Sequence, residues 1–184
     1  MQQGKDIKKA AKIIRRGGIV GYPTEGVFGI GCDPQNDEAL QRLIDLKRRD
    51  ANKGLIIIAA NRSQLEPFIS MVKESIEIRL NASWPGPVTW ILESSKNASP
   101  LLTGNRSTVA TRVTSHATAA KLCIAADHAI VSTSANLSGQ SSCKDAASVA
   151  DCFGDRIDYL LDLPVGDLDK PTPIFDGDTG RQLR

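Results

Sequence analysis

The strongest constraint on the fold is an alternation along the chain between short apolar runs and segments with helical periodicity. Apolar residues from Ile7 to Ile14 recur at the i, i+3, i+4 and i+7 spacing of one helix face. Three helices are expected at residues 6–16, 116–126 and 145–153. A fourth is expected to begin at Asn36 or Asp37 and to end in the basic segment 47–49. A fifth is expected to begin with a capping box at Ser63 and to end at residue 83, with a break near residue 67. Strands are expected at residues 19–22, 55–60, 88–92, 108–113, 129–132 and 159–163. We therefore predict one α/β domain over residues 1–184, with a twisted, mixed sheet flanked by helices.

The composition is that of an ordinary globular protein. The 184 residues are 41% apolar and 24% charged, and they contain no low-complexity tract or internal repeat. The longest apolar run is too short to span a membrane and the first residues lack the apolar region of a signal peptide, so we expect a cytoplasmic protein without membrane contact. Four cysteines without C-x-x-C spacing and two histidines argue against a metal site, a disulfide or a histidine-based triad.

Positive charge is concentrated in the N-terminal part of the chain. Residues 1–62 hold 12 Lys and Arg against 7 Asp and Glu, whereas residues 145–184 hold 4 against 9. The N-terminal part is therefore the candidate anion-binding part. Its densest cluster, between Lys5 and Arg16, is interpreted as the solvated face of the first helix.

The segment YPTEGVFGIG (22–31) follows the first predicted strand and is rich in glycine. Glycines after a strand often let backbone N–H groups approach a phosphate. The sequence contains neither G-x-x-x-x-G-K-[ST] nor G-x-G-x-x-G, the two common phosphate-binding patterns. A nucleotide would therefore bind in a cavity lined by separate Lys, Arg, Ser and Thr side chains from several loops.

Lys47, Arg49 and Lys53 stand between a predicted helix and a predicted strand. If the helix ends near Leu46, an extended segment would direct Lys47 and Arg49 toward one site. The alternative is that they are ordinary cations at a helix C-terminus, favoured by the helix dipole.

Two further positions carry polar groups suited to a ligand. Ser134 and Asn136 lie in the hydroxyl-rich segment STSANLSG (132–139), which is either a binding loop or a simple turn. Arg112 stands in the middle of a predicted strand, on the face opposite to Val109 and Val113. A guanidinium at that position suits a carboxylate or phosphate, and an exposed sheet face is the alternative.

Five segments together resemble the YrdC-like family, the threonylcarbamoyl-AMP synthases of the TsaC type. They follow the family's order and span most of the chain: YPTEGVFGIGCDP (22–34), LKRRDANKGLIII (46–58), WPGPVT (84–89), VATRVTSH (109–116) and VSTSANLSG (131–139). The resemblance implies a twisted mixed α/β sheet with a large basic concave cavity. The chain resembles the short form of the family.

The resemblance also implies an activity. The family joins L-threonine, bicarbonate and ATP into threonylcarbamoyl-adenylate and releases pyrophosphate, with Mg²⁺ accompanying the ATP. Proteins of a transfer complex (TsaD, TsaB and TsaE) then pass the threonylcarbamoyl group to the adenosine beside the anticodon of certain transfer RNAs. Contact with transfer RNA belongs to the same expectation.

Carried over position by position, the resemblance assigns roles to the residues that match the family's motifs. The catalytic residues would be Lys47, Arg49, Ser134 and Asn136. The ATP contacts would be Arg49, Lys53, Thr108, Ser134 and Arg184. The contacts to threonine and bicarbonate would be Thr24, Arg112, Ser132 and Thr172.

A few positions depart from the family's pattern. Gly26 stands where many members have Thr, and Phe28 stands where Tyr is common. Asp50 replaces the frequent Pro after K-x-R, and its carboxylate could neutralise part of the site. Thr172 and Pro173 replace a more usual Ser-Thr pair, which affects the assignments in the C-terminal segment.

A competing interpretation is an RNA-binding module that uses the basic cavity. The pI of 8.4 is only mildly basic, and the sequence contains no RRM, KH or double-stranded-RNA-binding signature. These observations favour the enzyme over the binding module.

Overall fold

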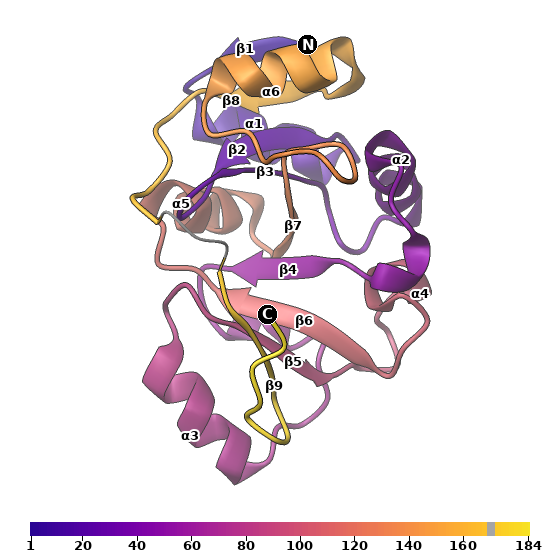
Figure 1. The fold of residues 1–184 in the computed structure, drawn as a ribbon, viewed down its shortest axis with the longest axis vertical. Coiled ribbons are helices and arrows are strands. Elements are labelled where there is room, and N and C mark those ends of the chain that lie inside the picture. Colours follow the sequence, from indigo (N-terminus) through magenta and orange to yellow (C-terminus); the bar gives the residue numbers. More distant parts are fainter. Residues whose placement is uncertain (169–171) are drawn as a thin grey trace.

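The computed structural model describes residues 1–168 and 172–184, whose strands form one nine-stranded mixed sheet (Figure 1). The strands are β1 (Gln2–Gly4), β2 (Val20–Pro23), β3 (Phe28–Gly31), β4 (Ile56–Ala59), β5 (Thr89–Glu93), β6 (Thr108–Val113), β7 (Ile130–Ser134), β8 (Tyr159–Leu161) and β9 (Ile174–Asp176). The helices are α1 (Ile7–Arg15), α2 (Asp37–Lys47), α3 (Glu74–Ser83), α4 (Pro100–Thr103), α5 (Ala117–Ala126) and α6 (Ala146–Phe153), with 3-10 turns η1 (Ala51–Lys53), η2 (Ser63–Leu65) and η3 (Gly154–Arg156). The predicted α/β class with a mixed sheet is confirmed.

The sheet is joined at its middle by β7. The strand order is β1-β8-β2-β3-β7-β4-β6-β5-β9. Thr133 and Ser134 of β7 pair antiparallel with β3, whereas residues 130–132 pair antiparallel with β4. Figure 1 shows β7 crossing between these two neighbours. The polar C-terminal end of β7 therefore lies where the two halves of the sheet meet.

One face of the sheet is covered by α1 and α5. Asp6 caps α1, and the buried residues of this helix are Ala10, Ala11 and Ile14, as its periodicity predicts. They share a core with Leu122 of α5. Burial of each large aliphatic side chain contributes about 1.5–3 kcal/mol, so the apolar face rather than helix propensity holds α1 in place.

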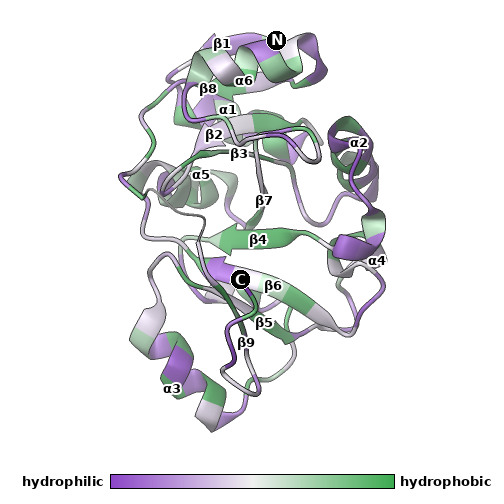
Figure 2. Cartoon of the chain, in the orientation of Figure 1, coloured by the Kyte–Doolittle hydropathy of each residue, from purple (hydrophilic) through white to green (hydrophobic). Residues whose placement is uncertain are grey.

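A second and larger core contains apolar residues of α2, α3, α4 and α6. The strand β4 contributes to both cores, because Ile57 and Ala59 belong to the larger one and Ile58 to the one beneath α1. Burial on both faces explains why this strand is an uninterrupted apolar run, which Figure 2 shows in green. None of the helices in the described residues combines the length and the apolar sequence needed to cross a bilayer.

The prediction of a helix that begins at Ser63 is wrong for the first part of that range. The residues from Ser63 form only the short turn η2, and the regular helix α3 begins at Glu74. The predicted capping box is absent, since Asn61 Oδ1 accepts the backbone N–H of Gln64 at 3.2 Å instead. Residues 66–68 form a turn, and Ile69 is then bridged to Ser94, the residue after β5.

Four elements were not expected from the sequence: β1, β3, α4 and β9. Each has only three or four residues, too few to show a period. In β3 two of the four residues are glycines, so the alternation of side chains that marks a strand is missing.

The glycine-rich segment is a hairpin of β2 and β3 rather than a phosphate loop. The backbone N–H and the Oγ1 hydroxyl of Thr24 both donate to the carbonyl of Val27, at 3.0 and 2.8 Å. A Cβ on Gly31 would lie 1.7 Å from the carbonyl oxygen of Val131, so only glycine lets β3 approach β7 this closely.

Gly26, at the tip of this hairpin, is in contact with a segment that follows β8. The N–H groups of Gly166 and Leu168 donate to the carbonyls of Thr24 and Glu25, at 2.9 and 3.0 Å. A Cβ on Gly26 would lie 2.1 Å from the carbonyl oxygen of Leu168. The absence of a side chain at position 26, where relatives often have Thr, therefore allows residues 166–168 to lie across the hairpin.

The substitution Gly26→Ala should destabilise the protein by about 1–3 kcal/mol, because the new methyl group meets backbone that cannot rotate away. Gly21→Ala is the comparison, since its Cβ would meet only side-chain atoms, at 3.0–3.3 Å, and should cost less. Urea unfolding of both variants measures the difference. An unchanged midpoint for Gly26→Ala would contradict the close contact with Leu168.

Candidate functional site

A cavity of about 230 Å³ lies at the junction where β7 passes from β3 to β4. The strand register explains its place, because Gly29 of β3 lies opposite Ser134 and Ile56 of β4 lies opposite Ser132. A side chain on Gly29 would meet Thr24 and Ser132, so its absence keeps the floor open. Seven of the predicted site residues line this cavity: Thr24, Arg49, Arg112, Ser132, Ser134, Thr172 and Arg184.

Arg112 is buried on the cavity side of β6, with its side chain 5% exposed. Its Nη1 donates to the hydroxyls of Thr89 and Thr172, at 3.2 and 3.0 Å. Its Nη2 donates to Glu25 Oε2 at 3.2 Å. The alternative of an arginine on an exposed sheet face is therefore excluded, and the guanidinium is held at the cavity wall from three sides.

Glu25 was missed in the sequence, although it lies within the glycine-rich segment. It is 6% exposed, and its Oε1 accepts a hydrogen bond from Thr114 Oγ1 at 2.6 Å. A buried carboxylate needs a cationic partner, and a search for the partner of a strand-centre arginine would have pointed to it.

Three guanidinium groups share the cavity: those of Arg49, Arg112 and Arg184. Burial lowers the pKa of Arg49, and the nearby Arg184 lowers it further. Burial and then Arg112 likewise lower the pKa of Arg184. Like charges collected in a partly buried space are costly in the free protein, so the arrangement favours an anionic ligand.

The two outer arginines of this group bind backbone carbonyls. Arg49 donates from Nε and Nη2 to the carbonyl of Gly54, at 3.2 and 2.8 Å. Arg184 donates to the carbonyl of Thr172 at 3.0 Å. Asp50 caps the turn η1 by accepting the N–H of Asn52, and its charge raises the pKa of Arg49. The expected partial neutralisation by Asp50 thus acts on Arg49.

Lys47 is a buried residue at the end of α2, and it does not line the cavity. Its Nζ donates to the carbonyls of Ser134 and Asn136, and lies 3.4 Å from Asn136 Oδ1. Ser134 Oγ donates to the same Oδ1 at 2.6 Å. Burial and then the charge of Arg49 lower the pKa of Lys47 to about 8. Lys47 therefore fixes the turn that presents Ser134 to the cavity.

Lys47 and Arg49 are brought together by a left-handed residue rather than by an extended segment. The helix includes Lys47, and Arg48 has φ 49° and ψ 44°. This reversal lets Arg49 line the cavity beside Ser134, which Lys47 also contacts. Lys47 does lie in the last turn of α2, as the helix-dipole interpretation expects, but it is buried, and Arg49 lines the cavity.

The remaining predicted residues lie outside the cavity lining. Lys53 is exposed on η1, and Asn136 is engaged by Lys47 and by the carbonyls of Leu137 and Gln140. Thr108, at the start of β6, lines a separate cavity beside β5. Conversely, several cavity residues were not assigned a role from the sequence. Four of them lie within the segments that carry the family resemblance and one lies outside: Val27, Gly29, Ile56 and Thr133, and Ser142.

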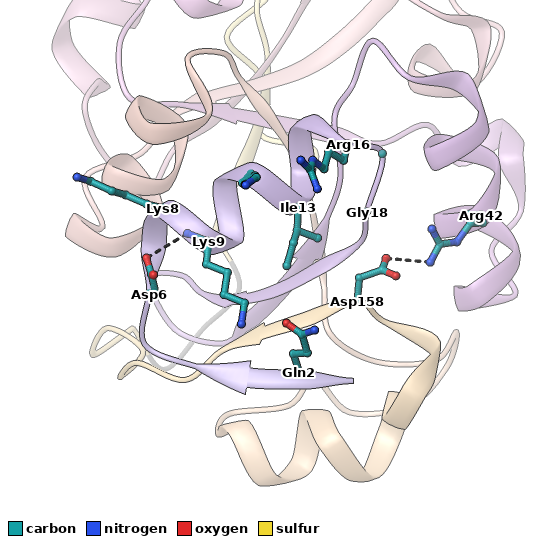
Figure 3. A pocket seen from close by; sticks show the side chains of 11 residues that line it. Gln2, Asp6, Lys8, Lys9, Ile13, Arg16, Gly18, Arg42 and Asp158 are labelled. Carbon is teal, nitrogen blue, oxygen red and sulfur yellow. Dashed lines mark hydrogen bonds and ion pairs between the residues drawn. The ribbon is translucent and has the colours of Figure 1, made fainter.

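A wider and more open hollow of about 830 Å³ lies along α1 (Figure 3). Its exposed cations include Lys8, Lys12 and Arg16, and Arg42 forms an ion pair with Asp158 at 2.9 Å. None of the predicted site residues lines this hollow. In the described residues, no three His, Cys, Asp or Glu side chains are grouped so that they could hold a metal ion.

The lowered pKa of Lys47 makes stability depend on pH. The unfolded chain keeps the proton up to about pH 10.5 and the folded chain up to about pH 8, so stability from this group rises with pH between these values. Relative to Lys47→Met, the wild type should gain at most about 1.4 kcal/mol per pH unit from pH 8 to 10. Urea unfolding across this range measures it, with exposed Lys53→Met as the control. A difference that stays flat would contradict the buried ammonium.

Comparison with known proteins identifies the family of this chain. A family model described as "Telomere recombination" (Sua5, YciO and YrdC) matches residues 12–184. The threonylcarbamoyl-AMP synthase of Vibrio vulnificus is 44% identical over 181 residues and 97% of each chain, and that of Idiomarina loihiensis is 48% identical over 172 residues and 92% of each chain. The structure of P. abyssi Sua5 complexed with L-threonine superposes on this chain with a TM-score of 0.89 and 32% sequence identity. The match covers 95% of this chain and 53% of the longer P. abyssi chain. The chain belongs to the Sua5/YciO/YrdC family.

Proposed function

We propose that this chain is a threonylcarbamoyl-AMP synthase, which converts L-threonine, bicarbonate and ATP into threonylcarbamoyl-adenylate and pyrophosphate. The observation that carries the proposal is the cavity with three arginines and a row of hydroxyls, in a chain whose relatives bear that name. The substrates bring a carboxylate, a carbamate and a triphosphate to one place. Fixed cations are what such a concentration of negative charge needs.

We infer that the threonine carboxylate binds to Arg112. This guanidinium lines the cavity and matches a carboxylate in shape and charge. Thr24, Ser132 and Thr172 line the same wall and would bind the threonine hydroxyl and the carbamate oxygens. A relative, P. abyssi Sua5, was solved in complex with L-threonine, which supports threonine as a ligand of this chain.

The phosphates of ATP would bind at the Arg49 and Arg184 end, with Ser134 between the two substrates. Lys53 follows Arg49 on the exposed turn η1 and would meet the outer phosphates. Thr108 keeps its ATP contact only by the family's pattern, since it lies beside a separate cavity.

The chemistry depends on position and charge. The threonine amine and bicarbonate give a carbamate and water, and a carbamate oxygen attacks the α-phosphorus as pyrophosphate leaves. Arginines aimed at the phosphates stabilise the charge that develops on the transferring group. Holding both reactants in one geometry removes most of the entropic barrier. Lys47 and Asn136 would act by holding the Ser134 turn in place, and the proton that the threonine ammonium loses before it forms the carbamate would pass to water.

Mg²⁺ is proposed to arrive with ATP as part of the substrate, because magnesium is usually held by phosphates and water rather than by an all-protein cage. We place the product in the modification of transfer RNA beside the anticodon, through a transfer complex of the TsaD, TsaB and TsaE type. ATP and transfer RNA are both available in the cytoplasm, which supports the expected location.

The RNA-binding module is not favoured as an alternative. The curated relatives are named as synthases over nearly the full chain. The strongest exposed cluster of cations lies along α1, apart from the arginine cavity. A filter-binding titration would favour the module only if RNA bound tightly and ATP were not consumed.

Purified protein incubated with ATP, Mg²⁺, L-threonine and bicarbonate should form pyrophosphate and threonylcarbamoyl-adenylate. Mass spectrometry of the quenched mixture detects the adduct, and reactions lacking one substrate at a time are the controls. Absence of the adduct with all substrates present would refute the proposed function.

The substitution Arg49→Ala should lower turnover about 100-fold or more, because one of the cations that stabilise the transferring phosphate is lost. The melting temperature should change little, since among the described residues the Arg49 side chain donates only to the carbonyl of Gly54. Arg16→Ala, which removes an exposed cation from the hollow along α1, is the matched control and should keep full turnover. Equal turnover in both variants would remove Arg49 from the site.

A further inference from the structure

Glu25 is a buried carboxylate that lies behind the cavity wall rather than in its lining. Both of its oxygens are used within the protein. Oε2 accepts from Arg112 Nη2 at 3.2 Å, and Oε1 accepts from Thr114 Oγ1 at 2.6 Å. Thr114 follows Arg112 by two residues, so one carboxylate spans two side chains that project from the same side of the chain.

The partners of the Arg112 guanidinium show which of its N–H donors are left for a ligand. A guanidinium has five N–H donors in one plane, and Thr89, Thr172 and Glu25 accept from three of them. The N–H of Nε is buried and has no partner among residues 1–168 and 172–184, whereas one N–H of Nη2 is unclaimed by the described residues. Since the group is planar and rigid, fixing three donors fixes the direction of the other two.

The position of Glu25 is itself fixed by the fold. Its carbonyl accepts the N–H of Leu168, and the neighbouring Gly26 is packed against the same residue. Thr172, farther along this segment, binds the other side of Arg112. Three parts of the chain that are distant in sequence therefore meet at one guanidinium.

We propose that Glu25 is a positioning residue for the amino-acid substrate, which holds Arg112 so that the unclaimed N–H of Nη2 faces the threonine carboxylate. The inference rests on the proposed function, in which Arg112 binds that carboxylate. A buried arginine without a counter-charge turns toward other acceptors or toward solvent, so loss of Glu25 would cost the preorganised orientation. The negative charge of Glu25 also repels the substrate carboxylate, and the sign of the measured effect decides which contribution is larger.

The test compares L-threonine with L-threoninamide, which lacks the carboxylate. For each protein variant, the KM of threonine and the inhibition constant of threoninamide are measured in the adduct assay, together with the KM of ATP. The ratio of the two ligand constants isolates the part of binding that depends on the carboxylate.

In Glu25→Ala the preference for threonine over threoninamide should fall about tenfold or more, with the KM of ATP within about twofold of wild type. Glu25→Gln keeps an acceptor for Arg112 and should lose less. Thr114→Val leaves the ion pair in place and should lower the same ratio by a smaller factor, which keeps the test usable if Glu25→Ala does not fold.

The matched control is Thr111→Val. Thr111 is buried on the opposite face of β6, where its hydroxyl donates to the carbonyl of Trp90 at 3.1 Å. This variant should lower the melting temperature and leave the threonine-to-threoninamide preference unchanged. A purely structural role for Glu25 would give the same pattern as this control.

The outcomes separate the inference from the function. If Glu25→Gln and Thr114→Val keep the wild-type preference, or if Glu25→Ala binds threonine more tightly, the positioning role is wrong while the synthase remains. If the wild type forms no adduct and does not distinguish threonine from its amide, the proposed function itself fails.

Discussion

The buried ion pair of Arg112 and Glu25 is the interaction on which the candidate site depends. It joins the strand β6 to the turn of the β2–β3 hairpin, which are adjacent neither in sequence nor in the sheet. Removing either partner would leave a buried charge uncompensated, which typically costs about 3–5 kcal/mol. Because separating the two buried charges costs free energy, the pair holds together the cavity wall between the two halves of the sheet.

Close backbone contacts make this arrangement possible. Gly31 lets β3 lie against β7, and Gly26 lets residues 166–168 lie across the hairpin. The departure at position 26 from the family's usual Thr is therefore linked to the path of a distant segment. Gly166 makes the reciprocal contact, because a Cβ there would lie 2.6 Å from the carbonyl oxygen of Glu25. Gly26 and Gly166, which are far apart in sequence, both allow residues 166–168 to cross the hairpin.

Local sequence patterns predicted the elements whose signal is carried by neighbouring residues, such as the apolar face of α1 and the apolar run of β4. They failed at Ser63, where the predicted capping box is replaced by a hydrogen bond from the backbone N–H of Gln64 to Asn61 Oδ1. The motifs contain most of the cavity residues. The role of Glu25 was not predicted, because its partner Arg112 lies 87 residues away in the sequence. Spacing along the chain carries no information about such a contact.

The repulsion between the cavity arginines, which is unfavourable in the free protein, also determines which substrate binds at each end of the cavity. Arg112 forms an ion pair with Glu25. Among the described residues, the side chains of Arg49 and Arg184 donate to neutral carbonyls, and burial and a neighbouring arginine lower the pKa of each, although Asp50 opposes this lowering at Arg49. In the described part of the chain, a direct ion pair is therefore present at the end assigned to the single carboxylate and absent at the end assigned to the phosphates. Any anion would gain by binding at the phosphate end, and a triphosphate, which carries the most charge, would gain most and displace a single carboxylate from it. The distribution of counter-charge thus sorts the two substrates before any contact specific to threonine or adenosine is made.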